Sequence, residues 1–137
     1  MAKFDIHKAA GIIIQDKKLL VVKPTDKKFF ISPGGSIEIG ESAVQAVIRE
    51  LKEELQIDVT DQNLQPFGIF YAQAAGEENK VIRMDTFIVT SYQGEIKIDN
   101  EIEQLAWISS TIPANMKVGS IFEHEVIPRL KAQGLIK

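Results

Sequence analysis

One stretch of this chain, residues 35–57 (GSIEIGESAVQAVIRELKEELQI), constrains the possible fold more than any other. Ser42 is followed three residues later by Gln45. This is the spacing of a capping box, in which two side chains satisfy free backbone N–H groups at a helix start. We therefore predict a helix from about Ala43 to Leu55, preceded by a loop that begins with glycine.

The predicted helix has an apolar face and an acidic face. At about 100° per residue, the apolar side chains fall in one stripe and the glutamates cluster roughly 120° away. Glutamates at positions i, i+3 and i+4 lie within about 5–6 Å of one another, so they destabilise a helix unless a cation neutralises them. Such oxygen ligands suit Mg²⁺ or Mn²⁺, although many acidic faces are simply solvated. The apolar stripe is Val44, Val47, Ile48, Leu51 and Leu55, and the acidic group is Glu50, Glu53 and Glu54.

The same stretch is similar to the Nudix box, the signature Gly, five residues, Glu, seven residues, Arg-Glu-aliphatic-any-Glu-Glu-any-Gly-aliphatic. One position departs, because Gln56 stands where the family has glycine. A left-handed residue after the helix costs a non-glycine side chain roughly 1 kcal/mol, so the departure concerns the helix end and not the carboxylates. The matching residues are Gly35, Glu41, Arg49, Glu50, Leu51, Glu53, Glu54 and Ile57.

The Nudix resemblance implies a fold and an activity. The fold is α/β (α+β), with a mixed β-sheet sandwiched between α-helices. The activity is Mg²⁺- or Mn²⁺-dependent pyrophosphohydrolysis of a nucleoside diphosphate linked to another group. We favour a nucleoside triphosphate, such as the oxidised purine nucleotides of MutT-like members, cleaved to the monophosphate and pyrophosphate. The alternatives are hydrolysis of ADP-ribose, a sugar nucleotide or a dinucleoside polyphosphate, and nucleotide sensing without catalysis. The intact acidic group favours hydrolysis.

The resemblance also implies roles for individual residues. Arg49 and Glu41 are expected to form a salt bridge that ties the loop to the helix, and so to support catalysis indirectly. The general base varies within the family; here Glu53 in the helix and Glu101 in a later loop are the candidates. Glu101 stands six residues before Trp107, as the extra acidic ligand of several members does, and Glu103 is a weaker substitute. The implied metal ligands are the Gly34 carbonyl, Glu50, Glu53, Glu54 and Glu101.

Four residues are candidates for contact with the substrate. Phe29 and Phe30 are successive strand residues, so one should face the core while the other stacks on a base; we assign the binding role to Phe30. The neighbouring glycines allow close backbone approach at Gly35. Arg83 reaches either a phosphate or a surface ion pair. Asn115 ends an Ile-Pro-Ala-Asn run that resembles the Pro-Ala-Asn turn of MutT-like members, and its amide suits purine recognition.

The rest of the chain predicts strands and one further helix. Runs of β-branched and apolar residues separated by turn residues indicate the strands, the first two forming a hairpin. Pro128 should kink or split the last helix. The strands are predicted over 8–15, 18–23, 29–32, 63–75, 81–92, 95–98 and 105–108, and the helix over 119–133.

Bulk properties narrow the class of protein. With 137 residues, the chain is predicted to form one domain, residues 1–137. A net charge of −3 argues against duplex nucleic acid as a partner and leaves a small-molecule nucleotide. The absence of cysteine excludes disulfides and a cysteine nucleophile, and disfavours the isomerases that share this fold. Without an apolar run long enough for a membrane span, we expect a cytoplasmic protein with no membrane partner. The Nudix resemblance also implies that a homodimer can form, through a sheet edge or the final helix, and segment 81–92 is long enough to offer such an edge.

Overall fold

The computed structural model describes residues 3–74, 77–99 and 101–137. A mixed four-stranded sheet, in the order β4-β1-β6-β5, forms the centre. Strand β1 runs parallel to β6 and antiparallel to β4. The bounds are Ile6–Ile12 for β1, Gly34–Ser36 for β4, Leu64–Ala74 for β5 and Glu77–Val89 for β6.

A smaller antiparallel sheet, in the order β2-β3-β7, continues from the end of β1. Its strands β2 and β3 form the predicted hairpin. The turn residues Asp16 and Lys17 both have positive φ, 51° and 62°, which matches the twist of a two-residue hairpin loop. The bounds are Ile14–Gln15 for β2, Lys18–Pro24 for β3 and Ile102–Ile108 for β7.

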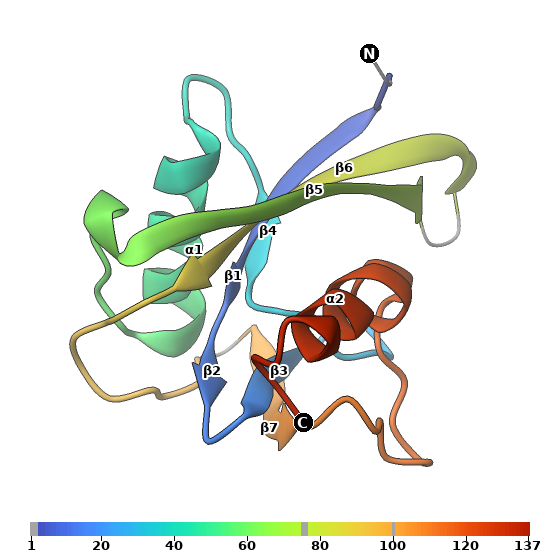
Figure 1. Cartoon of the computed structure of the whole chain (residues 1–137). Coiled ribbons are helices and arrows are strands. Elements are labelled where there is room, and N and C mark those ends of the chain that lie inside the picture. Colours follow the sequence, from blue (N-terminus) through green and yellow to red (C-terminus); the bar gives the residue numbers. More distant parts are fainter. Residues whose placement is uncertain (1–2, 75–76, 100) are drawn as a thin grey trace.

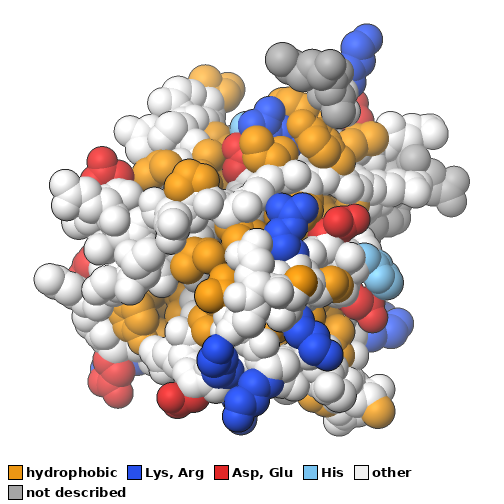
Figure 2. All heavy atoms as spheres, viewed as in Figure 1, with side chains coloured by type: hydrophobic (Ala, Val, Ile, Leu, Met, Phe, Trp, Pro, Cys, Tyr) orange, Lys and Arg blue, Asp and Glu red, His pale blue; other side chains and the backbone are white. Residues whose placement is uncertain are grey.

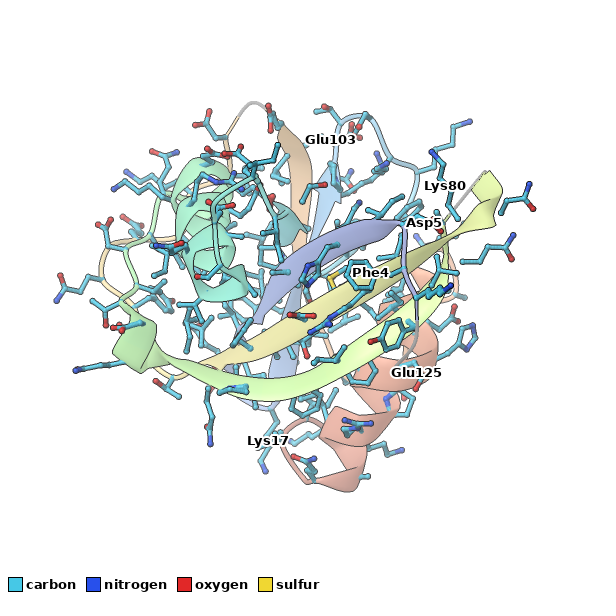
Figure 3. All side chains as sticks on the ribbon, turned by 90° about the horizontal axis from the view of Figure 1, so that it is seen from above. Phe4, Asp5, Lys17, Lys80, Glu103 and Glu125 are labelled. Carbon is cyan, nitrogen blue, oxygen red and sulfur yellow. The ribbon has the colours of Figure 1, made fainter. Side chains whose placement is uncertain are left out.

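The helices cover the two faces of the central sheet, as predicted. Figure 1 and the view from above in Figure 3 show α1 and α2 on opposite sides of strands β1, β6 and β5. Helix α1 spans Ala43–Leu55, and Asp61–Asn63 form a 3₁₀ turn before β5. Helix α2 spans Ile127–Ala132 and follows a π-helical turn, Phe122–Val126. The mixed sheet sandwiched between helices is therefore confirmed.

Strand β1 is buried on both faces, which explains its small residues. Ala9 and Ile13 belong to the core beneath α1, while Ala10 and Ile12 belong to the core beneath α2. At Gly11, an added Cβ would lie 3.3 Å from the side chains of Leu51 and Val47. The glycine thus lets α1 pack directly on the sheet.

Several predicted elements differ from the structure. Phe30 and Ile31 form only isolated bridges, and the strand in this region is β4. Segment 95–98 is not a strand; the Lys97 N–H instead bonds the Leu55 carbonyl at the end of α1, at 2.9 Å. Segment 81–92 does not provide a sheet edge, because β6 lies between β1 and β5. Residue 75, the last of the strand predicted over 63–75, and residue 76 lie outside the described residues.

Two irregularities of the helices lie at positions that the sequence singled out. Pro128 lies in the first turn of α2, directly after the π-helical turn, so the last helix is split as expected. Gln56 ends α1 in the left-handed conformation, with φ 60° and ψ 31°, although it is not glycine.

The outer surface carries charged and hydrophobic side chains side by side. Figure 2 shows acidic and basic side chains interspersed with hydrophobic ones on the face that carries α2. Within the part of the chain that the structure describes, no helix is long and apolar enough to cross a membrane.

Candidate active site

The loop before α1 is attached to the helix by one arginine. Arg49 donates from Nε to Glu41 Oε2 at 2.8 Å and from Nη2 to Glu41 Oε1 at 3.0 Å, so the expected ion pair is present and bidentate. Nη2 also donates to the Ser36 carbonyl at 3.1 Å. The Arg49 hydrogen bond lowers the pKa of Glu41 to about 2, and the same contact raises the pKa of Arg49. The loop is thereby held against the helix by charge-assisted bonds.

Glu50 and Glu54 form a close carboxyl pair on the inner side of α1. Glu54 is 8% exposed and its Oε1 accepts a 3.2 Å hydrogen bond from the Gly34 N–H. Burial raises the pKa of Glu54, and a hydrogen bond to Glu50 and the Glu50 charge raise it further. The two acids are thus pressed together where a negative charge is poorly solvated.

The glycines of β4 make room for this pair. An added Cβ on Gly35 would lie 2.5 Å from Glu50 Oε1, and one on Gly34 would collide with the Ala9 carbonyl. Only residues without a side chain allow α1 to bring its carboxylates onto this edge strand. For Gly34, the contact in the structure is from its N–H, whereas the sequence predicted a role for its carbonyl.

Glu53 does not join the pair. Its side chain is 53% exposed and its Oε2 accepts from Arg49 Nη1 at 3.3 Å. Arg49 also donates to Glu50 at 2.8 Å, so it contacts two of the three glutamates of the acidic group. Across residues 3–74, 77–99 and 101–137, no three His, Cys, Asp or Glu side chains are already grouped at metal-binding spacing.

Glu101 lies beside the carboxyl pair. It is exposed, and its charge contributes to raising the pKa of Glu54. Its backbone carbonyl accepts from the Thr25 N–H at 2.9 Å, which fixes the loop next to the end of β3. The weaker candidate, Glu103, instead forms an ion pair with Lys23 at 2.9 Å.

The donor set fits a hard divalent cation. Glu50 and Glu54 present crowded carboxyl oxygens, and Glu101 adds a further negative charge that acts on Glu54. A bound cation would offset both the burial and the repulsion that raise the pKa of Glu54. A metal site at these residues is thus chemically consistent with their environment.

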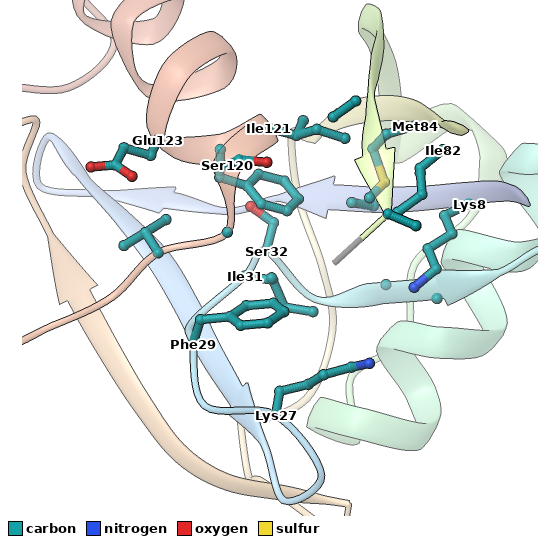
Figure 4. A pocket seen from close by; sticks show the side chains of 18 of the residues that line it. Lys8, Lys27, Phe29, Ile31, Ser32, Ile82, Met84, Ser120, Ile121 and Glu123 are labelled. Carbon is teal, nitrogen blue, oxygen red and sulfur yellow. The ribbon is translucent and has the colours of Figure 1, made fainter. Parts of the chain in front are cut away.

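A cavity of about 670 Å³ lies beside the glycines of β4. Its walls are largely apolar and come from β1, β6, the loop before β4 and the segment before the π-helical turn (Figure 4). Gly34 and Gly35 line it, so the cavity and the carboxyl pair meet at these glycines. The side chains labelled in Figure 4 are Lys8, Lys27, Phe29, Ile31, Ser32, Ile82, Met84, Ser120, Ile121 and Glu123.

Three of the four residues predicted to contact the substrate do not line the cavity. Phe30 is 9% exposed and packs in the core, and Phe29 lines the cavity in its place. Arg83 pairs with Asp85 at 2.8 Å on the opposite side of β6 from the cavity-lining Ile82 and Met84, so it does not reach the cavity.

Of the other two assignments, Gly35 lines the cavity. Asn115 lies in an exposed turn and is not among the lining residues, although the next two residues are.

Three lysines that the sequence did not mark as site residues line the cavity: Lys8, Lys27 and Lys117. Lys8 is a charged residue at the start of an apolar strand, which was a detectable signal. Lys27 stands in a Lys-Lys-Phe-Phe run, where the sequence does not indicate which lysine points inward. Ser32 was missed too; it lines the cavity, is 1% exposed, and its hydroxyl has no hydrogen-bond partner among the described residues.

Comparison with known proteins agrees with the fold. The model of the NUDIX domain matches residues 5–130, and the chain belongs to the Nudix family of phosphoanhydride hydrolases. The solved structure of MutT from Aliivibrio salmonicida and Vibrio cholerae is similar, with a TM-score of 0.73 and 31% identity over 93% of this chain and 98% of that one.

Three curated relatives span different substrates. The uncharacterised Nudix hydrolase YvcI of Bacillus subtilis is 31% identical over 96% of this chain and 84% of its own length. An ADP-ribose pyrophosphatase of Methanocaldococcus jannaschii is 30% identical, over 85% of this chain and 67% of its own length. An 8-oxo-dGTP diphosphatase of Proteus vulgaris is 32% identical, over 70% of this chain and 86% of its own length.

Proposed function

We propose that this protein is a Mg²⁺-dependent pyrophosphohydrolase that cleaves a nucleoside triphosphate to the monophosphate and pyrophosphate. The observation that carries the proposal is the meeting of the Glu50–Glu54 pair with an apolar cavity at the glycines of β4. The pair suits a cation that binds phosphates, and the cavity has room for a nucleoside. The half-buried ring of Phe29 is available to stack on the base.

Mg²⁺ or Mn²⁺ would be held by Glu50 and Glu54, and when bound it supplies charge screening of the phosphates and activation of water. In the reaction, a water oxygen attacks one phosphorus, the bond to the bridging oxygen breaks, and the water proton passes to a carboxylate. Arg49 keeps Glu50 in position and ties down the loop through Glu41. Glu101 is the better general base than Glu53, because Glu53 is held by Arg49.

The relatives support hydrolysis of a nucleoside triphosphate and name ADP-ribose as the alternative substrate. The Proteus vulgaris relative is named for a triphosphate substrate, and the Methanocaldococcus jannaschii relative for ADP-ribose. A cytoplasmic location and a small-molecule nucleotide as the sole ligand are part of the same proposal. A homodimer would use an edge strand of the sheet, such as β5, because segment 81–92 lies mostly in the central strand β6.

The test is a panel assay with Mg²⁺ or Mn²⁺ at mildly alkaline pH. It scores pyrophosphate and phosphate release from canonical and oxidised nucleoside triphosphates, ADP-ribose, sugar nucleotides and diadenosine polyphosphates. We expect pyrophosphate release from triphosphates that chelation abolishes. Preferential cleavage of ADP-ribose would replace the triphosphate assignment. Nucleotide-dependent thermal stabilisation without any turnover would establish a sensing module instead.

A further inference from the structure

Three lysines, Lys8, Lys27 and Lys117, line the cavity, and Lys8 and Lys27 carry the argument here. Lys8 extends from β1 and Lys27 from the loop after β3, and Figure 4 shows both side chains reaching into the same part of the cavity. Among the residues that the structure describes, neither ammonium group takes part in an ion pair or a hydrogen bond. Burying cations without partners is unfavourable, so this part of the cavity is suited to an anion.

The electrostatic surroundings agree with this conclusion. Burial lowers the pKa of Lys8, and the charge of Lys27 lowers it further, which outweighs the opposite effects of Asp26 and Glu50. The only acidic side chain that lines the described cavity is Glu123, which pairs with His124 at 3.5 Å and lies on the far side from Lys8 (Figure 4). The end of the cavity near β4 is therefore cationic.

This cationic end lies next to the carboxyl pair. Lys8 faces Ser36 in the pairing of β1 with β4, one position along from Gly35, and Glu50 packs directly against Gly35. The lysines and the carboxylates thus flank the same short edge strand. A polyphosphate chain that reaches across this edge would meet a cation on the carboxylates at one end and two ammonium groups at the other.

We infer that Lys8 and Lys27 together bind one phosphate of the substrate beyond the two that a metal ion would bind, and so select triphosphates over diphosphate derivatives. This inference rests on the proposed function and names the substrate class within it. The ligand chemistry is that of a nucleoside triphosphate or of free polyphosphate. A sugar nucleotide or ADP-ribose would leave the lysine pair without an anion.

The first experiment compares substrates with matched variants. Lys8→Met and Lys27→Met remove one ammonium group each, and Lys28→Met is the control, because Lys28 is adjacent, exposed and outside the cavity. We expect each cavity variant to lower kcat/KM for GTP by about tenfold, the typical effect of losing one charge-assisted hydrogen bond. The values for GDP and ADP-ribose should change by less than about twofold, and Lys28→Met should match the wild type for all three.

The second experiment measures binding without hydrolysis. Tripolyphosphate is titrated into the protein in the presence of EDTA, with heat of binding as the readout. We expect the wild type and Lys28→Met to bind equally well and the cavity variants to bind about tenfold more weakly. Thermal melting identifies any misfolded variant; if Lys8→Met does not fold, Lys27→Met, on a loop, carries the test.

The two experiments separate the failure of the inference from that of the proposed function. Wild-type affinity for tripolyphosphate in a folded cavity variant, together with an unchanged ratio of GTP to GDP hydrolysis, overturns the lysine site. If the wild type hydrolyses no nucleotide with any metal, the proposed function fails. Tripolyphosphate binding in EDTA still decides whether the lysines form a phosphate site in that case.

Discussion

Glu50 and Glu54 share a hydrogen bond between their carboxyl groups, one turn apart on α1, where the N–H of Gly34 also donates to Glu54. Two acids placed this close are stable together only when a proton or a cation lies between them. The inner face of the helix therefore couples folding, protonation and metal binding, and each can be measured separately.

The first prediction concerns Glu54→Gln. Without metal, the raised pKa of Glu54 means that the folded chain must take up a proton there at neutral pH, which costs stability. The amide avoids this cost, so the thermal midpoint at neutral pH should rise. Turnover should fall by at least about 100-fold, because loss of a partner in the outer shell of a metal site already costs 10–100-fold. Thermal melting in EDTA and a steady-state assay with Mg²⁺ measure the two effects. The control is Glu95→Gln, since Glu95 is exposed and outside the site. Wild-type turnover in Glu54→Gln would contradict the assignment of this residue.

The second prediction concerns pH. Because the pKa of Glu54 is raised in the folded state, its protonated form favours folding, and the contribution is complete below the ordinary value of 4.5. In EDTA, stability should therefore decline as pH rises from about 5 through neutrality. Added Mg²⁺ should restore stability, most strongly at the higher pH, since it binds the deprotonated acids.

Thermal melting between about pH 5 and pH 8, with EDTA or Mg²⁺, checks this dependence. Glu54→Gln should flatten the profile in EDTA and remove most of the response to Mg²⁺. An equally steep decline in that variant would assign the pH dependence to other groups.

The third prediction concerns the end of α1. Gln56 adopts φ 60°, a conformation that glycine accepts without strain. Gln56→Gly should raise the free energy of unfolding by about 1 kcal/mol, reduced by the weak 3.4 Å bond from Gln56 Nε2 to the Lys97 carbonyl. Gln56→Ala is the matched control, because it loses the same bond and keeps the strain. Denaturant unfolding that ranks Gln56→Ala above Gln56→Gly would show that strain is not the dominant effect.

Local sequence signals predicted the elements better than their pairing. The capping box and apolar stripe gave the bounds of α1, Ala43–Leu55, as the structure has them. They could not show that β4 begins at Gly34, because that strand exists only through its pairing with β1. The same holds for the central position of β6, which depends on a parallel contact distant in sequence.

In the candidate site, too, local spacing predicted some of the contacts and contacts between distant segments were missed. Spacing along the helix placed three glutamates on one face, and two of them meet. The third, Glu53, is held by Arg49, an interaction that helical spacing allows but does not select. Lys8 and Lys27 come from different segments, so only the folded chain brings them together.

The last prediction uses two adjacent aromatic residues that the sequence could not distinguish. Phe30 packs in the core and is 9% exposed, whereas Phe29 lines the cavity. Phe30→Ala should lower the free energy of unfolding by about 3–5 kcal/mol, because it leaves a cavity in a packed region. Phe29→Ala should change stability much less but raise KM for a nucleoside triphosphate roughly tenfold, because a stacking partner of the base is lost.

The two variants control for each other, because the deleted atoms are the same. Denaturant unfolding and steady-state kinetics on both, with tripolyphosphate as a substrate analogue that lacks a base, separate the two roles. Phe29→Ala should leave tripolyphosphate binding unchanged, since the lysines and the carboxylates remain. If Phe29→Ala instead weakens tripolyphosphate and nucleotide equally, the ring shapes the phosphate end of the cavity, and the base must lie against another wall.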